Sequence, residues 1–225
     1  MKTPLLVLAA LGSTLTAAQA QTTIGKGTGL LTGSVGFHTE TDDLTSNGNG
    51  GLNSKNTYRT FRLDFAVGGF VADNLALGVQ LQHTVTGGSY SSSSSNNQSG
   101  PPTSSTLRVG PMAQYYQMFS EQFGMTATLG AGYESDSQWA QRTSSYPPYY
   151  YYSNLKVSGY YVALTPGIVF FPVPKFGLTA SIGSLSYNRL KVKDTGSADR
   201  YLSALDAGFG LSQLQFGANY YFGRK

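Results

Sequence analysis

Residues 123–134 have the sequence FGMTATLGAGYE, in which apolar side chains alternate with threonine, glycine and, at the end, glutamate. Successive side chains of a β-strand point to opposite faces, so this alternation predicts a strand with one apolar wall and one polar wall. The segment is also long enough for a tilted strand to cross a bilayer, which takes about 9–11 residues.

The same alternation recurs along the chain and defines eight predicted strands. They are Gly29–Phe37, Tyr58–Phe70, Leu75–Val85, Leu107–Tyr116, Phe123–Glu134, Gly159–Phe171, Phe176–Tyr187 and Leu205–Phe222. Short connections at 71–74, 117–122 and 172–175 alternate with long ones at 38–57, 86–106, 135–158 and 188–204. Short turns on one rim and long loops on the other are typical of outer-membrane barrels. The predicted fold is therefore all-β, an eight-stranded antiparallel up-and-down transmembrane β-barrel.

Two predicted strands change phase along their length. The apolar positions slip by one residue near Ser212-Gln213 in the last strand and near Gly183-Ser184 in the strand before it. A bulge at each place would restore the two walls. Pro111 and Pro166 lie inside predicted strands, where each removes a backbone donor, and they are interpreted as further bulge positions.

The N-terminal residues have the pattern of a secretion signal. Lys2 precedes the apolar run 5–11, and Ala18-Gln19-Ala20 fits a small-x-small cleavage site. The apolar run is too short for a spanning helix, which needs about 20 residues. We therefore predict a signal peptide at 1–20 and an outer-membrane β-barrel domain at 21–225.

The composition agrees with a membrane barrel and excludes several other classes. With no cysteine, the chain has no disulfide framework, thiol nucleophile or thiolate metal site. Charged residues make up 12% of the chain, against about 25% in a typical soluble domain. The net charge of +4 is too small to indicate a nucleic-acid partner.

Three segments resemble a known family. They are GFVADNLALG at 69–78, GPMAQYY at 110–116 and PGIVFF at 166–171. They are similar to strands of the small outer-membrane β-barrel family (porin-like, of the OmpA/OmpX type), and the likeness extends over 27–222. The resemblance implies an outer membrane of a Gram-negative-type envelope, contact with its lipid, and insertion by the barrel-assembly machinery. Two departures are Gln114, where the family often has arginine, and the tail Gly223-Arg224-Lys225 after the last aromatic residue.

Charged and amide side chains fall on the polar wall of the predicted strands, where they would face the lumen. The predicted lumen-lining residues are Arg62, Asp64, Gln80, Gln82, Arg108, Gln114 and Glu134. Eight strands leave an interior just wide enough for side chains to fill, so we expect these groups to bond one another and block the lumen. The function favoured is a structural or surface-interacting barrel, and the alternative is a narrow channel for ions or small solutes.

A third hypothesis is a surface enzyme acting on lipid or peptide, because such enzymes resemble this fold and use histidine near the outer rim. His38, with Glu40 and Asp42 close in sequence, and His83 are the two histidines. A catalytic set must meet within hydrogen-bond reach, which the sequence does not establish. We expect ordinary polar rim residues, no enzymatic activity, no cofactor and no metal.

The most unusual segment is the tyrosine-rich run at 146–152. Tyrosine offers a broad contact area with a polar tip, which suits contact with an extracellular ligand through the long loops. The alternative is that the rings pack on neighbouring loops or extend the aromatic girdle. The candidate contact residues are Tyr146, Tyr149, Tyr150, Tyr151 and Tyr152. We expect a monomer.

Overall fold

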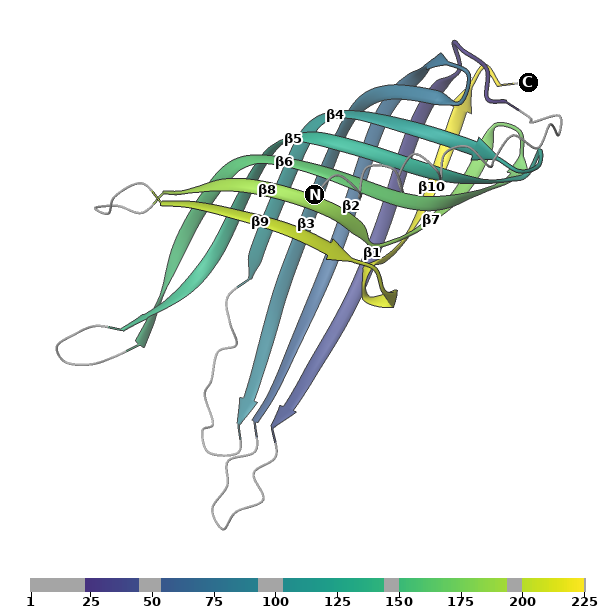
Figure 1. Cartoon of the computed structure of the whole chain (residues 1–225). Coiled ribbons are helices and arrows are strands. Elements are labelled where there is room, and N and C mark those ends of the chain that lie inside the picture. The colour runs from purple at the N-terminus through teal and green to yellow at the C-terminus, as the bar shows by residue number, and fades with distance from the viewer. Residues whose placement is uncertain (1–22, 45–53, 93–102, 144–149, 194–199, 225) are drawn as a thin grey trace, which may run out of the picture.

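The computed structural model describes residues 23–44, 54–92, 103–143, 150–193 and 200–224 (Figure 1). The elements within these ranges are β1 (Gly29–Leu44), β2 (Ser54–Ala72), β3 (Leu75–Ser92), β4 (Ser104–Met118), β5 (Phe123–Thr143), β6 (Tyr150–Val173), β7 (Phe176–Ile182), β8 (Ser184–Lys193), β9 (Arg200–Gly208), the single-turn helix η1 (Leu211–Gln213) and β10 (Leu214–Phe222). The described part of the chain contains no helix long and apolar enough to cross a membrane.

The strands form one closed antiparallel sheet. Strands β1 to β6 pair in chain order, β6 pairs with both β7 and β8, and β10 joins β7 to β1. β7 and β8 are the two halves of one barrel strand, and β9 and β10 are the two halves of another. The barrel therefore has eight strands. The predicted fold class is confirmed.

The two predicted phase changes are confirmed as strand breaks. Gly183 separates β7 from β8 with a φ of +86°, a backbone conformation that glycine adopts without strain. Pro166 lies opposite this break, since the β6 ladder runs from Leu164↔Leu185 to Gly167↔Ser181. The helix η1 separates β9 from β10. Pro111 causes no change of register, so its interpretation as a bulge is wrong.

The strands extend further outward than predicted. The β2–β3 ladder continues to Ser54↔Ser92, and the β5–β6 ladder to Thr143↔Tyr150. The predicted loops 38–57, 86–106 and 135–158 are therefore partly strand. The extensions are rich in serine, threonine and tyrosine, which lack the apolar alternation of a lipid-facing wall but can still form a ladder.

The outer surface of the barrel is apolar. Its exposed side chains include Leu31, Val35, Phe65, Val79, Leu129, Leu164, Leu178 and Phe216. In a soluble protein such a surface would be unfavourable, whereas a closed sheet satisfies its own backbone and can expose these side chains to lipid. The closed sheet, apolar exterior and rim asymmetry are those of outer-membrane barrels, and the protein spans the outer membrane of a Gram-negative-type envelope.

The outer ends of two strands are not paired with each other. Among the described residues, β1 pairs with β10 only over 29–36, and β9 pairs only with β8. We call residues 37–44 of β1 and 200–208 of β9 the outer seam. Figure 1 shows the outer ends of β1–β3 diverging from those of β5, β6, β8 and β9. Side chains on both faces of β9 are exposed as a result.

Candidate functional site: the lumen

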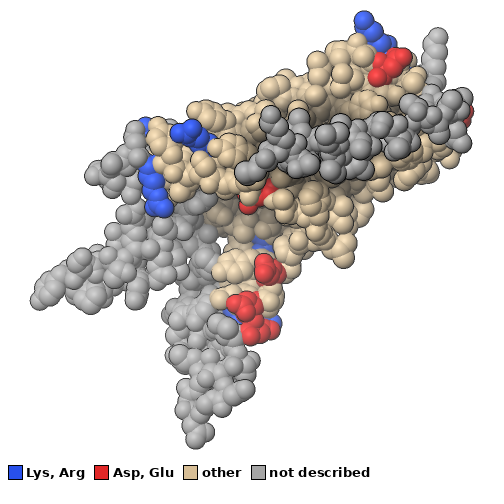
Figure 2. All heavy atoms as spheres, viewed as in Figure 1, with Lys and Arg blue, Asp and Glu red and all other residues tan. Residues whose placement is uncertain are grey.

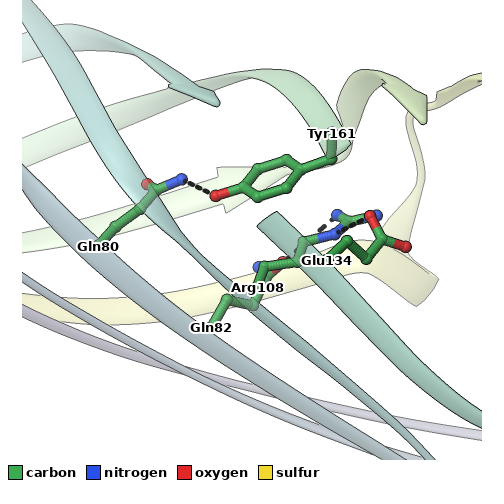
Figure 3. Close-up of polar contacts among 5 residues, drawn as sticks. All are labelled: Gln80, Gln82, Arg108, Glu134 and Tyr161. Carbon is green, nitrogen blue, oxygen red and sulfur yellow. Dashed lines mark hydrogen bonds and ion pairs between the residues drawn. The ribbon is translucent and has the colours of Figure 1, made fainter. Parts of the chain in front are cut away.

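A buried ion pair crosses between β4 and β5 inside the barrel. Arg108 Nε donates to Glu134 Oε2 at 2.8 Å, and Arg108 Nη1 donates to Gln82 Oε1 at 3.4 Å (Figure 3). The Glu134 side chain is only 2% exposed. The registers Gln82↔Arg108 and Arg108↔Glu134 place the three residues side by side on adjacent strands.

A second contact crosses the lumen beside this ion pair. Gln80 Nε2 donates to the hydroxyl of Tyr161 at 2.9 Å, and Arg108 Cζ lies 5.0 Å from the centre of the Tyr161 ring. The amide of Gln80 occupies the space where a side chain at Gly130 would begin. Glycine at 130 therefore lets Gln80 reach across to β6.

The carboxylate of Asp64 accepts hydrogen bonds from neutral side chains. Ser34 Oγ and Gln215 Nε2 both donate to Asp64 Oδ2, at 3.2 and 3.0 Å. Ser181 Oγ donates to Gln215 Oε1 at 3.4 Å. These bonds connect β2 with β1, β10 and β7. Arg62 Nε has no hydrogen-bond partner within the described chain.

A polar cavity of about 150 Å³ lies between these contacts. Six of the predicted lumen residues line it, namely Arg62, Asp64, Gln80, Gln82, Arg108 and Gln114. The seventh, Glu134, pairs with Arg108. Buried atoms without a protein partner, Thr32 Oγ1 and Asp64 Oδ1 among them, lie at the cavity. A cavity of this size with several polar groups in its wall can hold a group of ordered waters.

The inner end of the lumen, beside the short turns, is filled by aromatic and aliphatic side chains. We call this set the inner plug: Ile24, Leu30, Phe70, Met118, Tyr116, Val169, Phe171 and Tyr221. Tyr221 donates to the hydroxyl of Tyr116 at 3.1 Å, and its ring centroid lies 5.0 Å from that of Phe171. Tyr116 and Tyr221 are each 0% exposed.

Segments from both ends of the chain complete the inner plug. Ile24 N–H donates to Asn74 Oδ1 at 2.8 Å, and Asn74 N–H donates to the Ile24 carbonyl at 3.0 Å. Asn74 adopts a φ of +61° in the turn between β2 and β3. At the other end, Arg224 Cζ lies 3.9 Å from the centre of the Phe171 ring. Sequence reasoning did not predict this plug, because it treated the whole lumen as polar.

The histidines lie apart from each other. His38 stands in the β1 ladder opposite Thr60, and His83 in the β3 ladder opposite Leu107. Within the described residues, no hydrogen bond or ion pair joins either histidine to a serine or a carboxylate, and no group of three metal-ligating side chains occurs.

Some predicted features cannot be placed. The predicted signal peptide at 1–20, and Tyr146 and Tyr149, lie outside the described residues. The backbone of Tyr150, Tyr151 and Tyr152 begins β6 and pairs with residues 141–143 of β5.

No family model and no curated protein sequence matches the chain. Among solved structures, it is similar to Ail, the attachment invasion locus protein of Yersinia pestis, in complex with the heparin analogue sucrose octasulfate. That match has 13% identity and a TM-score of 0.37, covering 88% of this chain and 100% of the other. The outer membrane protein OprG from Pseudomonas aeruginosa has 14% identity and a TM-score of 0.44, with 88% of this chain and 97% of the other covered. The outer membrane protease OmpT from Escherichia coli has 9% identity and a TM-score of 0.31, with 88% of this chain and 92% of the other covered. Each likeness concerns the fold alone.

Proposed function

We propose that this protein is a non-enzymatic, non-conducting outer-membrane barrel whose role is structural or is exercised at the cell surface through its long loops. The observation that carries the proposal is the inner plug. A solute moving along the lumen would have to displace packed rings such as Tyr116 and Tyr221, which are fully buried. Eight strands leave little interior room for them to move aside.

The polar contacts further out support the same proposal. Arg108 is held by Glu134, Gln82 and the ring of Tyr161, so its charge does not stand free in a water-filled path. Asp64 is likewise held by Ser34 and Gln215. Movement of an ion past Arg108 and Asp64 would break several of these bonds at once.

The test is conductance of the purified full chain in a planar bilayer. Wild type is expected to give small, infrequent events or none. The double variant Tyr116→Ala/Tyr221→Ala removes two rings of the inner plug and is expected to give a steady leak. Large, steady conductance by wild type would overturn the proposal in favour of a narrow channel.

The chain offers a matched control for this experiment. Tyr115 and Tyr220 are the sequence neighbours of the two plug tyrosines, and both are exposed on the outer surface. Tyr115→Ala/Tyr220→Ala therefore removes the same side chains from the other wall of the same strands. It should leave conductance at the wild-type level, and a leak in this control would indicate general damage to the barrel.

A narrow channel is the second candidate, and the 150 Å³ polar cavity favours it. If the inner plug opened transiently, that cavity would form the middle of a conducting path.

For the enzymatic alternative, we propose that neither histidine is catalytic, because neither has an acid or nucleophile partner within the described chain. We further propose that the barrel is a monomer, that the assembly machinery inserts it, and that its tyrosine-rich loop meets any extracellular ligand.

A further inference from the structure

A cavity of about 680 Å³ lies at the inner rim, between the two ends of the described chain. This volume is within the range of small-molecule sites, roughly 300–1,000 Å³. Its wall is formed by residues between 23 and 28, the turns at 121–122 and 172–174, and the tail residues Gly223 and Arg224. Figure 1 shows the start of β1 and the end of β10 at this end of the barrel (upper right). The short turns of such a barrel face the periplasm, so a ligand would enter from there.

Backbone hydrogen bonds fix the N-terminal wall of this cavity, residues 23–28, which we call the strap. Gly27 N–H donates to the Phe70 carbonyl at 2.8 Å, and Phe70 N–H donates back to the Thr28 carbonyl at 2.8 Å. Lys26 N–H donates to Asp73 Oδ1 at 3.1 Å. The strap is therefore held against β2 and the turn that follows it. A wall that is already ordered costs little further ordering when a ligand binds.

Arg224 brings to this cavity hydrogen-bond donors that the protein does not use. Its Cζ atom lies 3.9 Å from the centre of the Phe171 ring, which attracts the charge but offers no oxygen to the five N–H donors of a guanidinium group. Arg224 is 9% exposed, and within the described chain its Nη1 atom has no hydrogen-bond partner. A buried donor without a partner is rare, and it indicates an acceptor that the chain itself does not supply.

The charges of the cavity wall favour a ligand with a single negative charge. Among its described residues, Lys26 and Arg224 are the cations and Glu121 is the one carboxylate, which leaves a net charge of +1. Lys26 and Glu121 are exposed and belong to neither ion pair between described residues. Figure 2 shows both basic and acidic side chains at this end of the barrel (upper right). A carboxylate carries one negative charge, whereas a phosphate monoester carries about 1.5 to 2 near neutral pH.

We propose that this cavity binds the carboxylate of a small periplasmic ligand, either the C-terminal end of a peptide or a small organic acid. The planar fork of the Arg224 guanidinium group matches the two oxygens of a carboxylate. Lys26 adds charge from the strap, and the apolar part of the ligand would lie against the wall at 172–174, where Val173 is exposed. The proposal rests on the orientation of the barrel and not on whether the lumen conducts.

The test is isothermal titration calorimetry on the full chain in detergent micelles at low ionic strength. The probes are N-acetyl-alanyl-alanine, the same dipeptide with an amidated C-terminus, and hexanoate. Wild type is expected to bind at least one of the two carboxylates and not the amide. Tighter binding of the dipeptide assigns the site to a peptide end, tighter binding of hexanoate assigns it to a small organic acid, and either result supports the proposal.

Two variants remove the site in different ways. Arg224→Gln removes the fork and should weaken carboxylate binding about tenfold, the effect of losing a hydrogen bond to a charged group. Gly25→Trp keeps both cations but fills the cavity, and it should abolish binding. A Cβ atom at Gly25 would meet no atom within 4 Å, so the strap can accept this side chain. Because Gly25→Trp leaves the contact between Arg224 and Phe171 in place, it tests the site even if Arg224→Gln does not fold.

The matched control is Lys175→Gln, because Lys175 lies in an exposed turn of the same rim but outside the cavity wall. This variant should bind the probes as wild type does, and circular dichroism verifies that each variant is folded. The proposal is overturned if neither carboxylate binds, if the amide binds as well as the acid, or if inorganic phosphate binds more tightly than both carboxylates. It is also overturned if Gly25→Trp binds like wild type, or if the control loses as much as Arg224→Gln.

Discussion

Arg224 lies with its Cζ atom 3.9 Å from the centre of the Phe171 ring and 5.7 Å from that of Tyr221. Gly223 and Arg224, which follow the last strand, therefore fold back over the inner plug, where Arg224 is 9% exposed. Burial lowers the pKa of the Arg224 guanidinium from its ordinary value, but arginine stays charged in proteins. A desolvated cation over an aromatic face stabilises by about 2 kcal/mol.

Truncating this side chain should weaken the barrel from its inner end. We expect Arg224→Ala to lower the free energy of unfolding by about 1–2 kcal/mol, and Arg224→Lys to lower it less because the cation is kept. Unfolding in urea from lipid vesicles measures both. Lys26, exposed on the same rim, provides the control, and an equal loss in Lys26→Ala would contradict a specific role for Arg224.

The two ion pairs between described residues should differ in their contribution to stability. Glu134 is buried, with a side chain 2% exposed, and Arg108 is half-buried at 20%, whereas Lys55 and Asp43 are 59% and 60% exposed. Glu134→Ala leaves a half-buried guanidinium without its carboxylate and should cost about 3 kcal/mol, the lower end of the range for a buried pair. Asp43→Ala should cost less than about 1 kcal/mol. Unfolding free energies of both variants test this, and comparable losses would mean that the lumen is hydrated like the surface.

The strands could be predicted because lipid contact demands a strict pattern. Every outward position near the middle of a strand must be apolar. Leu129 and the apolar residues at every second position around it therefore identify the lipid-facing wall from the sequence alone. The same demand explains the predicted breaks at Gly183 and near Ser212, where the pattern slips. Beyond the lipid no such demand exists, and the outward extensions of β2 and β5 were therefore missed.

The inner plug could not be recognised from an assumption that the lumen is polar throughout. A signal was nevertheless present in the sequence. Apolar pairs stand at the inner strand ends, at Tyr115-Tyr116, Phe170-Phe171 and Tyr220-Tyr221. One member of each pair faces lipid, so the other must face the lumen. The contacts of Ile24 and Arg224 depend on how the terminal segments fold back, which alternation does not encode.

The two walls should respond differently to the same charge. Leu129 is exposed on the outer surface, and its neighbour Thr128 lines the lumen cavity. Leu129→Arg places a charge in lipid and should cost roughly 2–4 kcal/mol more than Thr128→Arg if the site lies near the midplane. Unfolding from bilayers compares them. Equal losses, or the reverse order, would refute the assignment of the walls.

Processing provides a separate check on the N-terminus. Cleavage after Ala20 would leave a mature chain beginning at Gln21, because Ala18-Gln19-Ala20 has the small residues that the peptidase requires. The intact mass of the protein extracted from membranes should match that start. A mass that includes residues 1–20 would remove the sequence argument for export.

The outer seam should be detectable by cross-linking, because the chain contains no cysteine of its own. Val35 and Phe216 are ladder partners in the paired part of β1 and β10. Partners in an antiparallel ladder have Cα atoms about 4.5–5.5 Å apart, within the reach of a disulfide. Val35→Cys/Phe216→Cys should therefore oxidise readily in membranes. Two further double variants place one cysteine in the unpaired part of β1 and one in β9, and their cysteines should stay reduced. They are Thr41→Cys/Ser203→Cys and Thr39→Cys/Ser203→Cys. Efficient disulfide formation in either seam pair would show instead that β1 and β9 close on each other in the membrane, and that the barrel is sealed along its full height.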